Sequence, residues 1–413
     1  HLCNLSNVEM RVIIYTENMK YGGMDTFIVN LTKYWPDKDD ELFVICNDSH
    51  PGIKFLSKNL PSSVMLIRHQ IPVNWSFLSR FIRYLPILFQ KIFRKMFRYT
   101  LIPYQIYAIS SILKKYKGDA LLTVNGSYPG GETCRVANIA WRRVSKGVSI
   151  HNFHNYAERE LGVLSPLEYI IDQELLKATN HIVSVSNYCS STIVSRKAFK
   201  DLRSIITIPN GIKLPVNKNL VNLRDAYKIP ENKKILLMVS TFEERKGHKF
   251  ALDALRIALD KRDDLHLLLV GNATISEVQR VQRLINERGL VNHVTITGKI
   301  ENIASNMTGA DLVIIPSQDH ESFALTAVEA MLNELPIVAT NIGGIPETIG
   351  QDGHCGFLVD PNDPNNFSQK ISYIIDNHEF SKKMGANGLS RALSIFDPSK
   401  MANEYFKLTR TKL

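Results

Sequence analysis

The sequence has few cysteines, and their arrangement excludes two classes of site. The 413 residues include only five cysteines, Cys3, Cys46, Cys134, Cys189 and Cys355. An odd and widely scattered set provides neither a disulfide framework nor the paired spacing of a zinc site. Isolated cysteines are typical of a reducing compartment, so we expect a cytoplasmic protein.

Long hydrophobic runs are also absent. No stretch of about 18 uncharged apolar residues occurs, so we expect no membrane-spanning helix. Glycine and proline are close to average abundance, with 22 and 17 residues, which excludes collagen-like and low-complexity chains. With 44% hydrophobic and 22% charged residues, the composition is that of a globular chain large enough for two domains.

Acidic residues are missing from one long part of the chain. Residues 49–118 contain 12 Lys and Arg but no Asp or Glu. The net charge of +10 arises in the first half, where residues 1–213 carry 27 basic and 16 acidic side chains. A basic surface of this kind favours an anionic partner, such as lipid headgroups, nucleic acid or a polyphosphorylated substrate.

What is present is a regular alternation of short β-branched or leucine-rich runs with helical patterns, which predicts parallel α/β sheets. We expect strands at residues 11–15, 42–46, 64–68, 120–124, 148–150, 181–185, 204–208, 235–239, 265–270, 294–297, 312–315, 337–340 and 357–359. A Pro-Asn-Gly sequence at 209–211 and a polar stretch to 219 indicate a linker. We therefore predict two Rossmann-like, doubly wound domains, 1–212 and 213–397, facing each other across a cleft.

Two predicted strand-to-helix loops have features of anion sites. Gly22 and Gly23 open a helix after the first strand, and Lys246 with Gly247 precedes another helix after residues 235–239. The free N–H groups and dipole at a helix start favour an anion, and a lysine adds positive charge. The alternatives are a tight turn without a ligand and a solvated charged turn. The pattern Gly-x-Gly-x-x-Gly is absent after the first strand, which argues against a nicotinamide enzyme.

Two glutamates follow the predicted strand at 312–315. We place Glu321 in the loop and Glu329 on the second turn of the next helix, with the backbone N–H groups of residues 322–325 unpaired at its start. Carboxylates that accept hydroxyl hydrogen bonds beside amides that hold phosphate oxygens suit a sugar joined to a diphosphate. The alternative is an ordinary amphipathic helix with acidic residues near its start.

These motifs together resemble those of the retaining glycosyltransferases of family 4, which have the GT-B fold. The resemblance rests on Glu321-Ser-Phe-Ala-Leu-x3-Glu329, on residues 342–347 (Ile-Gly-Gly-Ile-Pro-Glu), on residues 208–211 (Ile-Pro-Asn-Gly) and on Gly22-Gly23. It covers essentially the whole chain. It also implies that a terminal helix at about 398–413 crosses back to the first domain.

The resemblance implies roles for individual residues. Glu329 corresponds to the glutamate that binds the nucleotide ribose, Glu321 to the one that contacts donor-sugar hydroxyls, and Lys246 to the lysine that meets the diphosphate. Where many members have an arginine, this chain has Thr241, so Arg245 either compensates or points to water. The donor-binding set that we predict also includes Gly22, Gly23, Gly298, Lys299, Ile300, Ser322, Phe323, Ala324 and Leu325.

A histidine near the transferred sugar is a further expectation from the resemblance. His151 follows the predicted strand at 148–150, and we take it with Glu321 as the catalytic pair. His154 is its rival, because two histidines three residues apart fit the same pattern. The structural alternative is a histidine that caps a loop. No third ligand lies nearby, so we expect no metal site from the pair.

The family chemistry that this implies is transfer of a hexose from a nucleotide sugar with retention, without an obligatory metal or cofactor. We expect a UDP-sugar first and a GDP-sugar next, and a lipid-linked or glycan acceptor in cell-surface polysaccharide or glycolipid synthesis. A nucleotide-sugar epimerase on the same fold is the enzymatic alternative. A basic nucleic-acid-binding protein is the non-enzymatic one, but it lacks any recognised binding motif, and we expect no nucleic-acid partner.

Residues 75–107 interleave basic residues with Trp, Phe, Leu and Ile. This pattern predicts an amphipathic segment, divided at Pro86, that binds an anionic membrane surface, so we expect a peripheral protein at the inner face of the membrane. Two alternatives are packing of the apolar side into the protein's own core and a contact between two copies of the chain. The sequence does not decide the oligomeric state.

Overall fold

The computed structural model describes residues 9–18, 22–73, 81–97, 99–160, 162–202, 204–214 and 221–411. The chain forms two compact units. Unit 1 comprises residues 1–211 together with 398–413, and unit 2 comprises residues 212–397. The sequence-based boundary lies between residues 212 and 213, one position further along the chain.

Unit 1 contains a seven-stranded sheet of order β3-β2-β1-β4-β5-β6-β7, in which all neighbouring strands are parallel. Its strands are β1 (Arg11–Glu17), β2 (Glu41–Asn47), β3 (Met65–His69), β4 (Ala120–Asn125), β5 (Val148–Phe153), β6 (His181–Ser184) and β7 (Ile206–Thr207). The order reverses between β1 and β4, so the loops that follow these two strands diverge at the carboxyl edge of the sheet.

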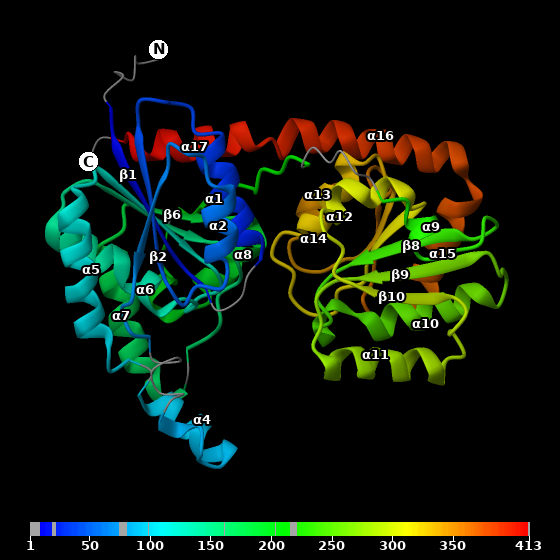
Figure 1. The fold of residues 1–413 in the computed structure, drawn as a ribbon, viewed down its shortest axis with the longest axis horizontal. Coiled ribbons are helices and arrows are strands. Elements are labelled where there is room, and N and C mark those ends of the chain that lie inside the picture. The colour runs from blue at the N-terminus through cyan, green and yellow to red at the C-terminus, as the bar shows by residue number, and fades with distance from the viewer. Residues whose placement is uncertain are drawn as a thin grey trace. The chain divides into compact units, whose positions relative to one another are not determined.

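Helices cover both faces of this sheet (Figure 1). The helices of unit 1 are α1 (Gly23–Lys33), α2 (Ile53–Asn59), α4 (Ile87–Met96), α5 (Ile102–Tyr116), α6 (Glu132–Val144), α7 (Ser165–Lys177), α8 (Asn187–Val194) and α17 (Pro398–Thr409), of which α4 does not lie on the sheet. Val12 and Ile14 of β1 pack into one core with α1 and α17, while Ile13 and Tyr15 pack into the other with α5 and α6. The alternation of side chains along the strand thus divides the interior between two layers.

Unit 2 contains a six-stranded parallel sheet of order β10-β9-β8-β11-β12-β13. Its strands are β8 (Lys234–Val239), β9 (Leu265–Val270), β10 (Val294–Gly298), β11 (Leu312–Ile315), β12 (Ile337–Thr340) and β13 (Phe357–Val359). All thirteen strands expected from the sequence are present, and the order reverses between β8 and β11.

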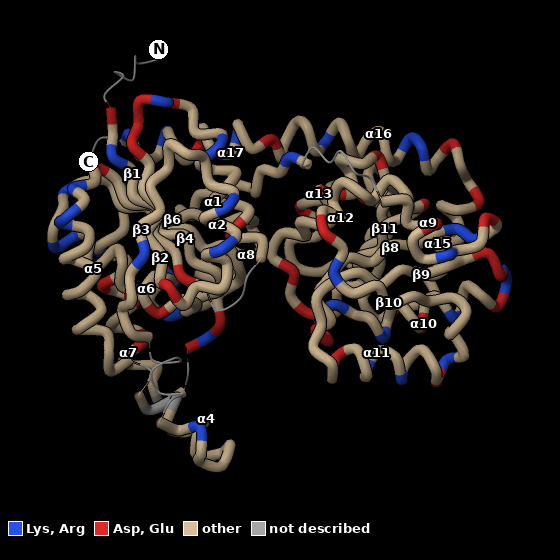
Figure 2. Tube along the Cα trace, in the orientation of Figure 1, with Lys and Arg blue, Asp and Glu red and all other residues tan. Residues whose placement is uncertain are grey.

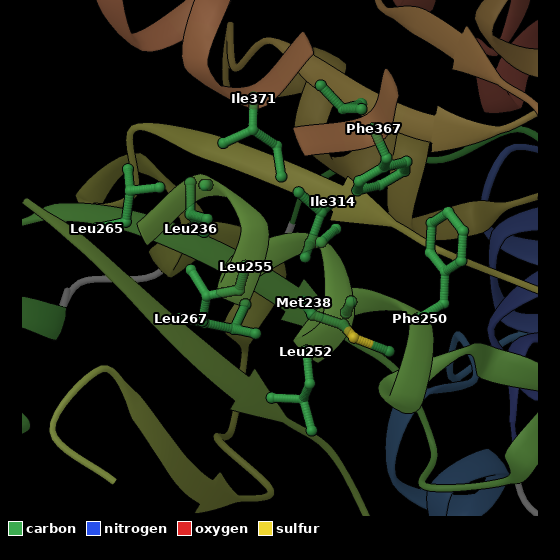
Figure 3. Packing of buried hydrophobic residues seen from close by; sticks show 14 of the residues in the cluster. Leu236, Met238, Phe250, Leu252, Leu255, Leu265, Leu267, Ile314, Phe367 and Ile371 are labelled. Atoms are coloured by element: carbon green, nitrogen blue, oxygen red, sulfur yellow. The ribbon is translucent and has the colours of Figure 1, made fainter. Parts of the chain in front are cut away.

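The helices of unit 2 are α9 (Leu223–Ala226), α10 (His248–Leu259), α11 (Ile275–Glu287), α12 (Ile303–Asn306), α13 (Leu325–Leu332), α14 (Ile345–Ile349), α15 (Pro364–Asp376) and α16 (His378–Ile395). Figure 3 shows the core that β8, β9 and β11 form with α10 and α15. Leu236, Leu255 and Leu267 are fully or almost fully buried there, which fixes the carboxyl ends of the strands that carry the candidate site.

The last helix, α17, packs on α1 and β5 of unit 1. Asn152 of β5 donates a hydrogen bond to the Tyr405 hydroxyl at 2.6 Å, and Arg410 is paired with Asp40 at 2.8 Å. The Tyr405 ring also meets Phe27 of α1 edge-on. The end of the chain is therefore an integral part of the first unit.

Unit 1 holds a buried network of charges between α6, α7 and the segment after α8. Asp172 accepts hydrogen bonds from Arg135 at 2.8 Å and from Arg196 at 2.9 Å. Arg196 also reaches Glu168 at 2.9 Å, and all four side chains are almost inaccessible to solvent. Two cations and two carboxylates thus compensate one another's charge at a place where water cannot hydrate them.

Loss of the Asp172 charge should destabilise unit 1 strongly. Asp172→Asn leaves two buried guanidinium groups short of a counter-charge, and we expect a loss of about 3–5 kcal/mol. The matched control is Glu174→Gln on the same helix. Glu174 forms an exposed ion pair with Lys177, so its loss should lower the unfolding free energy by no more than about 0.5 kcal/mol. Urea unfolding followed by tryptophan fluorescence reports on this unit, because Trp35, Trp75 and Trp141 all belong to it. Equal losses in both variants would contradict the role of the network.

Candidate active site

The candidate site of unit 2 is centred on an ion pair between Lys246 and Glu321. Lys246 ends a short 3₁₀ turn after β8, and its Nζ donates a hydrogen bond to Glu321 Oε2. Ser317, after β11, donates to the same oxygen at 3.3 Å, and Arg245 Nη1 lies 3.9 Å from it. Burial alone would raise the pKa of Glu321, but the charges of Lys246 and Arg245 outweigh it and lower the pKa. Glu321 is therefore an ionised carboxylate held by two cations.

Two glycines allow this pair to form. Gly247 has φ +80°, and a Cβ there would lie 1.8 Å from the carbonyl oxygen of Pro316. Gly343 has φ +57°, and a Cβ there would lie 2.3 Å from the carbonyl oxygen of Glu321. The next residue, Gly344, donates its N–H to that same oxygen at 2.6 Å. Only glycine fits at 247 and 343, so the Gly-Gly motif predicted after β12 positions the backbone of Glu321.

The structure decides between the two orientations considered for Arg245. Its guanidinium donates to Glu243 at 2.7 Å and to the carbonyl of His320 at 3.2 Å. The side chain is thereby held beside Glu321 and does not simply extend into water. Thr241 is exposed on the loop after β8. A fixed cation thus lies four residues after the position where many family members carry arginine.

Glu329 lies on the second turn of α13, as the sequence predicts. Burial raises the pKa of Glu329 to about 7. No other described side chain donates a hydrogen bond or an ion pair to its carboxyl group. The residue as a whole is half-buried, and its largely desolvated carboxyl group, which has no partner among the described side chains, is suited to accept hydrogen bonds from a ligand.

The start of α13 is held rigidly. Ala324 precedes the helix with φ +52°, a conformation that is unfavourable for a residue with a Cβ. Thr348 donates its hydroxyl hydrogen to the carbonyl of Phe323 at 2.5 Å, and the Phe323 ring packs edge-on against Phe396. Ser322 is also buried. The predicted phosphate-binding amides at 322–325 therefore belong to a fixed loop.

The segment Gly298-Lys299-Ile300 lies at the carboxyl end of β10, two strands away from β8. Gly298 has φ +73°, and no described atom lies within 4 Å of where its Cβ would be. Lys299 is exposed. The segment stands beside open space, but its assignment to the nucleobase stays a prediction.

In unit 1, the Gly22-Gly23 turn is organised by Asp25. Gly22 donates its N–H to Asp25 Oδ2 at 3.0 Å, and His50 Nε2 lies 2.6 Å from Asp25 Oδ1. His50 Nδ1 accepts the N–H of Asn18, so His50 donates from Nε2 to Asp25. We did not predict this buried pair. The adjacency of β1 and β2 could have indicated it, since parallel neighbours bring the loops after them together.

His151 is buried within β5, which corrects the prediction that the strand ends just before it; its role toward a donor sugar stays a prediction. β5 continues to Phe153, and the ring of His151 donates to Asn138 at 2.8 Å and accepts from Asn125 at 3.5 Å. It is fully inaccessible to solvent, and burial, assisted by the charge of Arg135, lowers its pKa to about 3. Both ring nitrogens are thus occupied inside the unit.

His154 follows the end of β5 and has a different environment. Its Nε2 accepts a hydrogen bond from Asn210 at 3.3 Å, so its Nδ1 carries the proton. That Nδ1 is buried without a hydrogen-bond partner, and burial lowers the pKa of His154 to about 4. His154 is therefore a neutral imidazole whose buried Nδ1 has no described hydrogen-bond partner. Which of the two histidines lies near a donor sugar stays a prediction.

No three His, Cys, Asp or Glu side chains in the described part of the chain gather in a way that could hold a metal ion. No helix formed by the described residues is long and apolar enough to cross a membrane.

Family models match both units. Residues 21–214 match the model of Glycosyltransferase Family 4, and residues 221–391 match that of Glycosyl transferases group 1. The chain belongs to the family 4 type of glycosyltransferases. Together with two parallel Rossmann-like sheets, this confirms the α/β fold and the family expected from the Glu-x7-Glu motif.

Curated relatives agree with this assignment at low identity. A glycosyltransferase of Methanocaldococcus jannaschii is 27% identical over 59% of this chain and 70% of its own length. An N-acetyl-alpha-D-glucosaminyl L-malate synthase of Bacillus anthracis is 28% identical over 50% and 53%, respectively. A phosphatidyl-myo-inositol mannosyltransferase of Mycobacterium leprae is 26% identical over 65% and 68%. The aligned parts thus span about half to two thirds of these proteins.

Solved structures share the GT-B fold. A glycosyltransferase from Rickettsia africae has a TM-score of 0.76 at 22% identity, with 97% of this chain and 98% of that one covered. Anabaena HepE in complex with UDP has a TM-score of 0.72 at 18% identity, with 96% and 99% covered. At these identities the likeness establishes the fold alone.

The raised pKa of Glu329 predicts a pH-dependent stability. Because the folded-state pKa is about 7 and the unfolded value 4.5, the carboxyl group destabilises the fold increasingly as the pH rises from 4.5 through 7. Glu329→Gln should therefore match the wild type near pH 4 and exceed its unfolding free energy by up to about 3 kcal/mol at pH 8. Calorimetry at both pH values measures this difference. The exposed control Glu334→Gln should change neither value, and a Glu329→Gln variant that is less stable at pH 8 would contradict the account.

Proposed function

We propose that the protein is a retaining hexosyltransferase that uses a nucleotide-sugar donor bound by unit 2. The observation that carries this proposal is the Lys246–Glu321 pair together with the unpartnered carboxyl of Glu329. A donor diphosphate would compete with Glu321 for Lys246. Glu321 would then be free to accept hydrogen bonds from the sugar hydroxyls, while Glu329 accepts them from the ribose. One ion pair thus keeps both groups positioned before the donor arrives.

The charges available support transfer without an obligatory metal or cofactor. Departure of the nucleoside diphosphate places negative charge on its terminal phosphate, and Lys246, Arg245 and the N-terminus of α13 supply positive potential from fixed positions. We propose front-face transfer, in which the leaving phosphate helps to deprotonate the acceptor hydroxyl. Such a mechanism requires no protein nucleophile.

UDP is the nucleotide that we propose first, with GDP second. HepE has been solved with UDP, with UDP and glucose and with UDP-glucose, which supports the uridine nucleotide. A screen of UDP, GDP, ADP and their sugars by thermal shift tests this choice. The expected result is stabilisation by UDP compounds, and stabilisation by none of them would contradict a donor site.

For the acceptor we propose a lipid-linked compound or a glycan at the inner face of a membrane, in cell-surface polysaccharide or glycolipid synthesis. The acid-free region at 49–118 supports this, and so does the mannosyltransferase of Mycobacterium leprae, whose name gives a phospholipid acceptor. The exposed apolar side chains of α4 argue against the alternative that this helix packs into the core.

The two glutamates should give different kinetic signatures. Glu329→Ala removes a charge-assisted hydrogen bond to the ribose and should weaken binding of the nucleotide sugar by about 1.5–3 kcal/mol. Glu321→Gln should lower kcat more than it weakens binding, because contacts to the sugar tighten in the transition state. Isothermal titration with the donor and initial-rate kinetics provide both quantities. Unchanged binding and turnover in both variants would contradict the assignment.

The two histidines can be separated by comparing turnover with stability. His154→Ala removes the unused Nδ1 donor and should reduce kcat about tenfold or more, with little change in the melting temperature. His151→Ala breaks two buried hydrogen bonds and should lower the unfolding free energy by about 1–3 kcal/mol, with turnover per folded molecule retained. The reverse pattern would return the catalytic role to His151.

A further inference from the structure

Unit 1 exposes a concentration of large apolar side chains on one segment. Of the 21 large apolar residues that are exposed in the described part of the chain, eleven lie within residues 81–107. Tyr84, Ile87 and Leu88 are 81%, 72% and 67% exposed. Scattered single residues of this kind are ordinary, but a contiguous group indicates a surface that another body covers.

The helix α4 is amphipathic, with one apolar side and one largely polar side, as in helices that lie at the interface between a bilayer and water. At 100° per residue, positions 88, 89, 92, 93 and 96 fall within an arc of about 140° and are Leu, Phe, Ile, Phe and Met. The opposite arc holds Ile87, Gln90 and the basic positions 91, 94 and 95. The described members of the apolar arc are exposed, and Figure 1 shows α4 extending away from the sheet beyond α7. An apolar face bordered by lysine and arginine is the pattern of a helix lying in a bilayer interface.

Charge complementarity identifies the partner. α4 lies in the middle of the 70 residues that contain no Asp or Glu, and Figure 2 shows no acidic residue along its described part. Arg83, which precedes the helix, stacks on the ring of Tyr84 with 4.5 Å to the centroid. A protein partner for an apolar helix would need no such excess of one charge, whereas an anionic lipid surface attracts it.

The chain just after α4 is anchored to unit 1. Tyr99, three residues after α4 ends, donates its hydroxyl hydrogen to Glu168 in the first turn of α7. Glu168 is held in turn by Arg196 of the buried network. Two exposed residues, Leu167 and Ile170, flank Glu168 and lie three positions apart, so they share one side of α7. The Tyr99–Glu168 hydrogen bond therefore links the chain just after α4, and with it the exposed apolar surface, to the buried charge network.

We propose that the apolar arc of α4, together with Leu167 and Ile170 at the start of α7, docks unit 1 on an anionic bilayer. The acyl boundary receives the apolar side chains, and the basic positions of α4 meet the headgroup phosphates. The Tyr99–Glu168 contact anchors the chain just after the helix to α7. The inference rests on the proposed function, because docking would bring the carboxyl edge of unit 1 to a membrane-presented acceptor.

Vesicle co-sedimentation of the full chain tests this docking. We expect binding to phosphatidylcholine vesicles that contain phosphatidylglycerol, weak binding to phosphatidylcholine alone, and loss of binding at high salt. Leu88→Glu/Ile92→Glu should reduce the partition coefficient at least about a hundredfold. Lys91→Gln/Arg94→Gln/Lys95→Gln should reduce it by about a hundredfold at low salt. The control Ile275→Glu/Val291→Glu replaces two exposed apolar residues of unit 2 and should bind as the wild type does.

Each remaining outcome overturns the docking proposal. These are no binding by the wild type at low salt, equal binding to both vesicle types, or full binding by Leu88→Glu/Ile92→Glu. A lipid-independent dimer in analytical ultracentrifugation that the same variant abolishes would make the surface a contact between copies. Nucleotide binding without vesicles separates the two proposals: if the Leu88→Glu/Ile92→Glu variant binds UDP normally but not vesicles, donor binding is unaffected. If the wild type binds vesicles but no nucleotide, the proposed function fails alone.

Discussion

The contact between Lys246 and Glu321 is the constraint on which the candidate site depends. It joins the loop after β8 to the loop after β11, and these strands are neighbours at the point where the strand order reverses. The pair forms only because glycine at 247 and at 343 lets each loop approach the backbone of another. Arg245 and Ser317 then complete the surroundings of the same carboxylate. A site of two opposite charges, each the natural partner of a different part of a nucleotide sugar, follows from this single contact.

In unit 1, by contrast with the Lys246–Glu321 pair of unit 2, a group of charged side chains is buried and pairs internally. The four ionic groups of the network formed by Arg135, Glu168, Asp172 and Arg196 pair with one another, and they fix α6, α7 and Arg196 around Tyr128. The buried side-chain atoms of unit 1 without a described hydrogen-bond partner include Arg135 Nη1 in this network and His154 Nδ1 outside it. Tyr99, in the chain just after α4, is attached to the network through Glu168.

Much of the fold followed from the sequence because buried parallel strands are near-continuous apolar runs, such as residues 265–270 and 235–239. The Glu-x7-Glu spacing placed Glu321 in a loop and Glu329 on a helix, since both positions follow from local rules. The different surroundings of His151 and His154 could not be predicted from the sequence, because they depend on where β5 ends and on side chains from α6. The pairing of Lys246 with Glu321, 75 residues apart, and the orientation of Arg245 likewise arise only from strand order.

The measurement that tests the central claim most directly is UDP binding by calorimetry in a double-mutant cycle of Lys246→Met and Glu321→Gln. If the ion pair holds Lys246 for the diphosphate, Lys246→Met should weaken UDP binding by about 1.5–3 kcal/mol. Glu321→Gln should bind UDP at least as tightly as the wild type, because it releases Lys246 from its partner, and the double variant should resemble Lys246→Met. Equal weakening by both single variants would show that the two residues act as a structural unit, and it would contradict the account.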